Sequence, residues 1–537
     1  MGDAARAVES VERFLHRHVE ATHAPGMAVA LTDRQRTLAV LTSGYAELAA
    51  KTPVVPEHLF QIGSISKGFT AIALLQEREA GRLDLEAPVT AYLPWFEVRS
   101  RFAPITIHHL LSHSSGIVQG TDYTAEALHE VWSLRETETG FPPGEGYLYS
   151  NAGFKALGLV LEAVAGKPWW EVVRERILEP LEMTSTDPIT THDTRRRLAV
   201  GYWPPYDDRP WHTSHGWVEA TWVESGTADG TICSPVGELA AYARLLLNDG
   251  AGAAGPVISP ESFALMTQRA TPAPDEGAFY GYGVRWLDES GLLLLGHSGS
   301  TLGYCGWVLT DPQAGIGAAV LANAYVERLS VVRYAVSAMR AAVLGEEVPP
   351  PSEPDSPARV RNAEEFVGEY RSPRRRMSIV AEGEGLALEL EAGRVPFERR
   401  SDDDFVVPNP AFELFPLRFV REGDSVVAAT HGPDHYVRDG EPVDVPSPVE
   451  WDAFVGHWRS HDPWFSNFRV FVRSGRLVLA GSTADDEGDW ELTALPDGSF
   501  RVGDERSPDR VVFDTVIDRR ATRAVFDAAP FYRTFTP

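Results

Sequence analysis

A seven-residue motif occurs twice in the last third of this 537-residue chain and restricts how that part can fold. Phe-Val-Gly-Glu-Tyr-Arg-Ser at 366–372 returns as Phe-Val-Gly-His-Trp-Arg-Ser at 454–460, 88 positions later. Short alternations of apolar and polar residues, separated by turn residues, follow each copy and are typical of β-strands. A duplicated all-β module explains both observations. We expect two small barrels, at 361–442 and 448–537, rather than one barrel made of two halves.

The residues before the repeat show different sequence patterns. A proline-rich, polar stretch at 347–360 is typical of a stiff linker. Upstream of it, apolar periodicities indicate an amino-terminal helix, a β-hairpin, a mostly helical middle, strands between 292 and 321, and a last helix near 327–344. We therefore predict an α+β fold for 1–346, with an antiparallel sheet flanked by helices and an all-helical subdomain inserted.

A helix is expected from Phe69 onward, and residues at its start indicate a nucleophilic serine. Ser64 lies in its first turn, and Lys67 follows three residues later on the same face. The positive helix end favours an oxyanion, and a nearby amine can accept the proton of the serine. Only four residues of the chain are lysines, and Lys67 alone has a serine three positions before it. A buried lysine can lose its proton near neutral pH, whereas an arginine cannot. The alternative is a serine cap followed by a solvated lysine.

Two later motifs, each present once, would supply what such a nucleophile needs. The Y-x-N motif at 149–151 precedes a helix; its tyrosine can pass a proton to the leaving group, and its amide can hold Lys67 and a substrate carbonyl. The H-x-G motif at 297–299 is expected at the end of a strand, whose edge can offer backbone groups to an extended substrate. Either motif alone also fits a capped turn or a structural histidine. Their joint occurrence favours a catalytic serine.

Composition excludes several other classes of function. A net charge of −27 repels nucleic acid and anionic membrane surfaces, and no apolar run is long enough to span a bilayer. We therefore expect a cytoplasmic protein with no nucleic-acid partner and no membrane span. Two cysteines are too few for a disulfide framework or a thiolate metal site. The H-E-x-x-H pattern of zinc hydrolases and the G-x-S-x-G elbow of α/β-hydrolases are both missing from the sequence. We expect no metal or cofactor, and the sequence carries no signal for an oligomeric state.

With their neighbouring residues, the three motifs resemble the serine β-lactamase and penicillin-binding-protein superfamily, in its class-C-like branch of esterases and D-aminopeptidases. The resemblance rests on the stretches 60–67, 106–116 and 143–153 and covers about 8–345. It extends loosely to the rest of the chain, because family members with a similar tail of two lipocalin-like modules are D-aminopeptidases.

The resemblance implies a role for each motif residue. Ser64 would be acylated, Lys67 would act as its base, and Tyr149 would shuttle the proton. The backbone N–H groups of Ser64 and Ser300 would form the oxyanion hole. Three further residues would contact the substrate: Asn151, His297 and Gly299.

One departure from the family pattern bears on the substrate. The third motif usually begins with a lysine that pairs with a substrate carboxylate, but here it begins with His297, which is largely neutral at pH 7. We therefore predict a serine hydrolase that forms an acyl-enzyme with D-amino-acid amides, short peptides or small esters. The alternatives are a penicillin-binding D,D-peptidase or weak β-lactamase, and a non-catalytic binding scaffold. We assign the histidines of 106–116 to the scaffold and Asp229-Gly230 to a turn.

Overall fold

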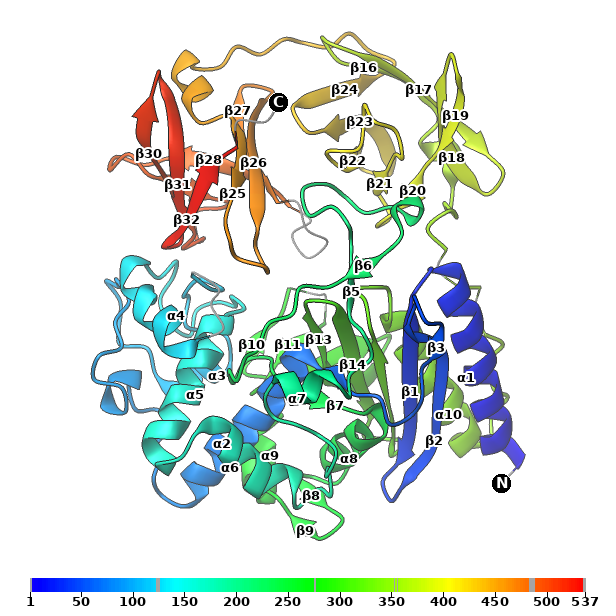
Figure 1. Ribbon diagram of the computed structural model, residues 1–537, viewed down its shortest axis with the longest axis vertical. Helices are drawn as coiled ribbons and strands as arrows, with labels where there is room; N and C mark the ends of the chain where they lie inside the picture. Colours follow the sequence, from blue (N-terminus) through cyan, green and yellow to red (C-terminus); the bar gives the residue numbers. More distant parts are fainter. Residues whose placement is uncertain are drawn as a thin grey trace. The chain divides into compact units, whose positions relative to one another are not determined.

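The computed structural model of the protein describes residues 2–121, 126–274, 277–351, 353–354, 356–481 and 488–534. Positions 352 and 355 of the expected linker, and 482–487 and 535–537 of the second expected module, lie outside the described residues. The chain forms two compact units (Figure 1). Unit 1 comprises Met1–Trp203 and Glu219–Pro354, and unit 2 comprises Pro204–Val218 and Asp355–Pro537.

Unit 1 is built on an antiparallel sheet with the strand order β10-β11-β12-β13-β14-β15-β1-β2-β3. The strands are β1 (Gly26–Asp33), β2 (Thr37–Glu47), β3 (Thr52–Pro53), β10 (Thr271–Pro272), β11 (Phe279–Tyr280), β12 (Arg285–Glu289), β13 (Leu292–Thr301), β14 (Tyr304–Asp311) and β15 (Ile316–Ala322). The amino-terminal hairpin joins strands from the end of the unit, because β1 pairs with β15 in the centre of the sheet. Short ladders also join β4 (Phe60–Gln61) to β7 (Cys233–Ser234), β5 (Tyr202–Trp203) to β6 (Val218–Glu219), and β8 (Ala251–Gly252) to β9 (Gly255–Pro256).

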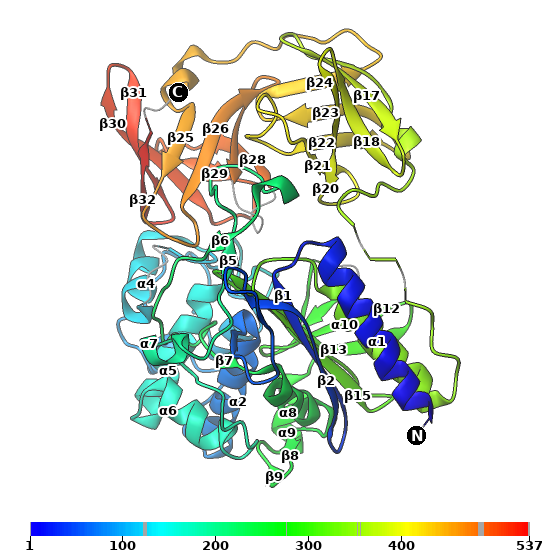
Figure 2. The same ribbon diagram turned by 45° about the vertical axis from the view of Figure 1, so that its right-hand side comes forward.

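Helices cover both faces of this sheet. Helices α1 (Gly2–Ala21) and α10 (Leu329–Leu344) lie side by side on one face (Figure 2), and α8 (Val236–Leu247) packs against β1, β14 and β15 on the other. Every residue of β14 and β15 is consequently buried. Continuous burial explains why these strands read as apolar runs rather than as alternating patterns.

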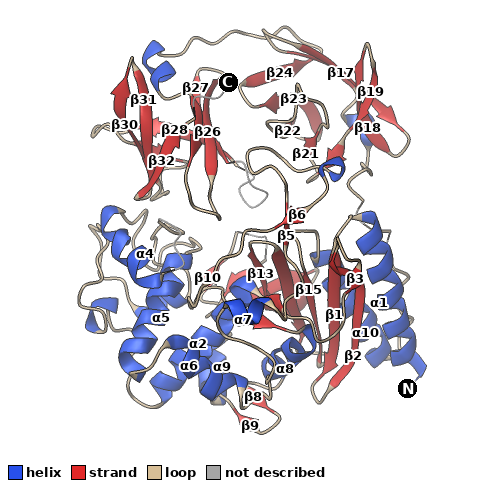
Figure 3. Ribbon diagram, viewed as in Figure 1, coloured by secondary structure: helices blue, strands red, loops and turns tan. Residues whose placement is uncertain are grey.

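The helical subdomain surrounds α2 (Ser66–Glu79), which is buried along most of its length. The other helices of unit 1 are α3 (Ile107–Leu111), α4 (Ala127–Ser133), α5 (Asn151–Ala165), α6 (Trp169–Val173), α7 (His192–Arg195) and α9 (Pro260–Met266) (Figure 3). Thr106 caps α3, and Gly166 ends α5 in a left-handed conformation that glycine adopts without strain. The predicted α+β fold with an all-helical subdomain is confirmed. No helix of the described residues combines the length and apolarity needed to cross a membrane.

Unit 2 contains two all-β modules, as predicted. The first module contains β16 (Gly368–Arg371), β17 (Arg376–Glu382), β18 (Gly385–Leu390), β19 (Gly393–Pro396), β20 (Glu398–Arg399), β21 (Asp404–Val406), β22 (Leu417–Glu422), β23 (Ser425–His431) and β24 (Asp434–Arg438). The second module is a closed barrel of β25 (Gly456–Arg459), β26 (Asn467–Arg473), β27 (Arg476–Gly481), β28 (Asp489–Ala494), β29 (Phe500–Val502), β30 (Arg510–Ile517), β31 (Arg520–Phe526) and β32 (Ala529–Arg533).

The two modules share one strand plan. In the second module, the first half of β28 pairs with β27 and its second half pairs with β29. In the first module, β19 pairs with β18 and β20 pairs with β21, and only Phe397 separates β19 from β20. The pair β19–β20 therefore occupies the place of β28, and the first module is the same barrel with one strand interrupted.

An arginine from the last strand of each module explains the glycine of the repeated motif. Arg438 donates a hydrogen bond to the carbonyl of Val367, and Arg533 donates one to the carbonyl of Val455. A side chain on the glycine that follows would force these arginines to shift: a Cβ on Gly368 would lie 3.0 Å from Arg438 Nε, and one on Gly456 would lie 2.6 Å from Arg533 Nη1. The repeat thus marks where each barrel closes.

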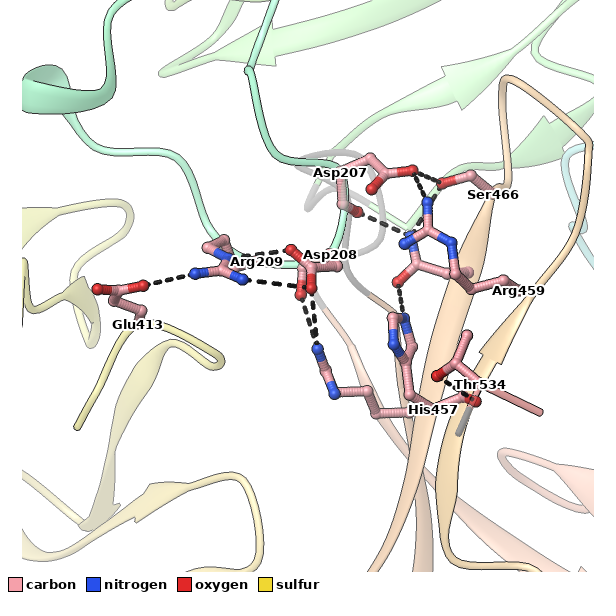
Figure 4. A network of polar contacts seen from close by, with 10 residues as sticks. Asp207, Asp208, Arg209, Glu413, His457, Arg459, Ser466 and Thr534 are labelled. Atoms are coloured by element: carbon pink, nitrogen blue, oxygen red, sulfur yellow. Dashed lines mark hydrogen bonds and ion pairs between the residues drawn. The ribbon is translucent and has the colours of Figure 1, made fainter. Parts of the chain in front are cut away.

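Unit 2 also holds a segment from the middle of the chain, 204–218, which the sequence analysis placed in the first domain (Figure 4). The Asp207 carboxylate accepts hydrogen bonds from Arg459 and Ser466 of the second module. Arg209 donates a hydrogen bond of 2.6 Å to Glu413 of the first module. The segment therefore makes charged contacts with both modules, and such contacts leave no periodic signal in the sequence.

Candidate active site

Ser64 and Lys67 lie together at the start of α2. Ser64 belongs to a short 3₁₀ turn (Gly63–Ile65) that continues directly into α2, so it precedes the first α-helical turn rather than lying in it. Lys67 Nζ is 3.0 Å from Ser64 Oγ. The serine is partly exposed, whereas the lysine is fully buried. This arrangement leaves the hydroxyl open to a substrate and keeps the amine away from water.

The partners of Lys67 are three oxygens, which fit a neutral amine as well as an ammonium. Its Nζ lies 2.8 Å from Asn151 Oδ1 and 2.8 Å from the backbone carbonyl oxygen of Asp229. Both oxygens can only accept hydrogen bonds, so they take the two N–H groups of a neutral amine and leave its lone pair for the Ser64 hydroxyl. Burial lowers the pKa of Lys67 to about 7; the Asp229 charge opposes this shift and the Lys155 charge adds to it.

Tyr149 completes the hydrogen-bonded group around the serine. Its side chain forms a hydrogen bond with Ser64, and Lys67 Nζ lies 4.9 Å from the centre of its ring. Burial raises the pKa of Tyr149, and the hydrogen bond to Ser64 opposes this shift. The phenol therefore keeps its proton at neutral pH and can donate it. Ser64, Lys67 and Tyr149 are the three residues to which the sequence assigned catalytic roles, and the structure brings them together.

The third motif reaches the serine through its backbone. A Cβ on Gly299 would lie 1.9 Å from the carbonyl oxygen of Ile62 and 3.0 Å from Ser64 N, so only a glycine permits this approach. On the other side, a Cβ on Gly63 would lie 2.5 Å from Ser300 N. Strand β13 and the 3₁₀ turn thus pack backbone against backbone, with the N–H groups of Ser64 and Ser300 in the contact region. This proximity of the two N–H groups is one requirement of the predicted oxyanion hole.

His297 is a neutral residue in the wall of the site. The sequence analysis expected the H-x-G motif at the end of a strand. Strand β13 continues to Thr301, so the motif instead lies inside the strand. The buried ring donates from Nδ1 to the carbonyl of Ser298 and accepts at Nε2 from the Tyr280 hydroxyl, 3.0 Å away. Burial lowers the pKa of His297 to about 3; the Ser298 contact opposes this shift, and the Lys67 and Arg285 charges add to it. This side chain cannot offer a positive charge to a substrate at neutral pH.

Two residues of the site were missed in the sequence. Asp229 lies in a turn, as the sequence predicted, and its backbone carbonyl also accepts a hydrogen bond from Lys67, a role that any residue type could fill. Arg285 lies on β12, where it pairs with Gly296, next to His297. Its positive charge acts to lower the pKa of both Tyr149 and His297. Its position depends on the register of β12 against β13, which the sequence alone does not reveal. Within the described residues, no cluster of three or more His, Cys, Asp or Glu side chains is arranged to hold a metal ion.

Comparisons with known proteins agree with this arrangement. The sequence model of the family described as Beta-lactamase matches residues 11–337. Penicillin-binding protein 4 of Amycolatopsis lactamdurans is 28% identical over 315 residues, which are 56% of this chain and 81% of that protein.

Solved structures show the same fold. The octameric penicillin-binding protein homologue from Pyrococcus abyssi has a TM-score of 0.59 at 25% identity, over 80% of this chain and 100% of that one. A D-stereospecific amidohydrolase from Streptomyces sp. has a TM-score of 0.51 at 24% identity, over 61% of this chain and 98% of that one.

Proposed function

Because this chain belongs to the beta-lactamase family, we propose that it is a serine hydrolase that cleaves amide or ester bonds through an acyl-enzyme on Ser64. One observation carries the proposal: a buried lysine with a pKa of about 7 lies 3.0 Å from the hydroxyl of a partly exposed serine. At neutral pH much of this lysine is unprotonated and can accept the proton of the serine.

Each residue has a definite task in the proposed reaction. As Ser64 Oγ attacks the substrate carbonyl carbon, its proton moves to Lys67, and the N–H groups of Ser64 and Ser300 hold the oxyanion. Tyr149 gives its proton to the leaving amine or alkoxide when the bond breaks, and the proton on Lys67 replaces it. Water then attacks the acyl carbon and gives one proton to Lys67 and Tyr149. The bond between the acyl carbon and Ser64 Oγ breaks, the acid is released, and Ser64 Oγ takes up that proton.

Our first candidate for the substrate is a D-amino-acid amide, a short D-amino-acid peptide or a small ester. His297 is neutral, so the third motif supplies no cation for a carboxylate. Asn151 accepts from Lys67 through Oδ1, which leaves its NH₂ group to donate to a substrate carbonyl. Both features fit a substrate whose end near β13 is uncharged.

Arg285 favours a second candidate, a penicillin-binding D,D-peptidase. Its guanidinium charge acts on both Tyr149 and His297, so a cation lies near the site although the third motif has none. Arginine is well suited to binding a carboxylate through two hydrogen bonds. The relative from Amycolatopsis lactamdurans is also named a penicillin-binding protein.

Mass spectrometry during turnover tests these proposals. The wild type and Ser64→Ala are incubated in parallel with a p-nitrophenyl ester, D-alanine p-nitroanilide and a penicillin. We expect product release and a transient adduct on Ser64 in the wild type, and neither in the Ser64→Ala variant. A penicillin adduct that persists, and that Arg285→Met weakens, would identify the second candidate. No adduct from any compound would refute the hydrolase and leave a binding scaffold.

A further inference from the structure

His113 follows helix α3 and is held at a local energetic cost. Its backbone has a φ of 54°, a left-handed conformation that non-glycine residues rarely adopt. The ring is fully buried, and its Nε2 atom has no hydrogen-bond partner among the described residues. A strained backbone and an unpaired buried polar atom persist only where the surrounding structure enforces them. The remaining contacts of His113 show what this arrangement achieves.

His113 holds the backbone on both sides of Tyr149. Its carbonyl oxygen accepts a hydrogen bond of 2.8 Å from the N–H of Leu148. Its ring atom Nδ1 accepts one of 3.1 Å from the N–H of Ser150. The centre of the His113 ring also lies 4.2 Å from the centre of the Tyr149 ring. His113 thus packs against the Tyr149 ring and also holds the two residues next to Tyr149 in the chain, Leu148 and Ser150.

The ring can do this only as a neutral imidazole. Because Nδ1 accepts from Ser150, the ring proton resides on Nε2. Burial lowers the pKa of His113 well below its ordinary value, and the Lys67 charge lowers it further. The acceptor at Nδ1 therefore remains available throughout the neutral pH range.

We propose that His113 is a positioning residue that fixes the Tyr149 ring beside Ser64 and Lys67, through the Leu148 and Ser150 hydrogen bonds. The inference rests on the proposed function, in which Tyr149 relays the proton. His109 provides a matched control in the same stretch of chain. Its Nδ1 also accepts from a backbone N–H, that of Thr106, 3.1 Å away, but this contact caps α3 instead of holding Tyr149.

Two substitutions separate the acceptor from the ring. His113→Asn keeps an acceptor at the δ1 position and suits a left-handed backbone, whereas His113→Phe keeps a ring and removes the acceptor. We expect His113→Phe to lower kcat about 100-fold with little change in KM, because a small displacement of a catalytic group has an effect of this size. His113→Asn should stay within about tenfold of the wild type, and His109→Phe should leave kcat unchanged. If His113→Phe is not recovered folded, His113→Gln replaces it, since its amide oxygen lies one bond too far out to reach Ser150.

A double-mutant cycle with Tyr149→Phe shows whether His113 acts through the tyrosine. We expect His113→Phe to lower kcat no further in the Tyr149→Phe background. Losses that multiply, or a His109→Phe loss equal to that of His113→Phe, would overturn the proposal and leave His113 a general support.

Crystal structures give a readout that does not depend on activity. The wild type should keep Lys67 Nζ near 4.9 Å from the Tyr149 ring centre, and His113→Phe should displace that ring. An unmoved ring would overturn the proposal even if the hydrolase is confirmed. A displaced ring in a protein that forms no Ser64 adduct would support the positioning role and refute the proposed function alone.

Discussion

Two lysines are buried in neighbouring helices of unit 1, and their partners differ. Lys67 on α2 faces a hydroxyl and two carbonyl oxygens, none of which carries a charge. Lys155 on α5 forms an ion pair with the carboxylate of Glu130 on α4. The side chain of Glu130 is completely buried and that of Lys155 nearly so. Both sites thus bury a lysine in the interior of unit 1. Lys67 contacts uncharged groups there, whereas Lys155 contacts a charged one.

The comparison teaches that the partner decides what a buried lysine does. Neutral oxygens do not offset the loss of hydration, and the Asp229 charge offsets only part of it, so the pKa of Lys67 falls to about 7 and the residue can act as a base. A carboxylate gives Lys155 an opposite charge and makes the pair a link between α4 and α5. The two sites also interact, because the Lys155 charge helps to lower the pKa of Lys67.

The largest effect should come from exchanging each lysine for arginine. Lys67→Arg keeps a positive charge but cannot lose its proton, so we expect kcat to fall by about 1,000-fold or more. Lys155→Arg keeps the charge that pairs with Glu130, so we expect kcat within about tenfold of the wild type. Steady-state kinetics on one reactive ester measures both. Equal losses of kcat in the two variants would contradict the assignment of Lys67 as a base and of Lys155 as the partner in an ion pair.

A smaller effect is expected on stability when the ion pair is broken from one side. Burial raises the pKa of Glu130 to about 7, and Lys155 opposes this shift, so urea unfolding is measured at pH 8, where the carboxyl is ionised. Glu130→Gln leaves a buried ammonium without its counter-charge and should cost about 3 kcal/mol. Replacing both partners by methionine should cost much less. Similar losses in the two variants would show that the pair itself contributes most of the stability.

The smallest effect concerns the pH dependence of activity. Lys67 must be neutral to act as a base, so kcat/KM should rise with pH through about 7. Removing the Lys155 charge raises the pKa of Lys67, so the Lys155→Met/Glu130→Met variant should move this rise to higher pH by less than about one unit. A shift to lower pH would contradict the assigned coupling.

The sequence predicted the parts of the site that belong to local motifs. Ser64, Lys67, Tyr149 and Asn151 could be found because each stands at a fixed spacing at the start of a helix. The α+β class and the duplicated β module followed from periodicity and repetition. These features are local along the chain, which is why one sequence reveals them.

The rest depends on contacts between distant segments. Glu130 and Lys155 are 25 positions apart on different helices, and nothing in either helix marks the other as its partner. Arg285 reaches the site through strand register, and Asp229 contributes a backbone atom that every residue has. The sequence analysis assigned His113 to the scaffold because it lies in the stretch 106–116. Its hydrogen bonds to 148 and 150 form only when that stretch packs against the segment before α5.

The central claim is that Lys67 is the base for Ser64, and its protonation can be followed directly. Only four lysines occur in the chain, so protein labelled with ¹³C at lysine Cε gives a spectrum simple enough to titrate by NMR. The signal that disappears in Lys67→Arg belongs to Lys67. We predict that this signal titrates with a midpoint near pH 7. A midpoint near the ordinary lysine value of about 10.4 would mean that Lys67 is an ammonium at neutral pH, and it would contradict the account.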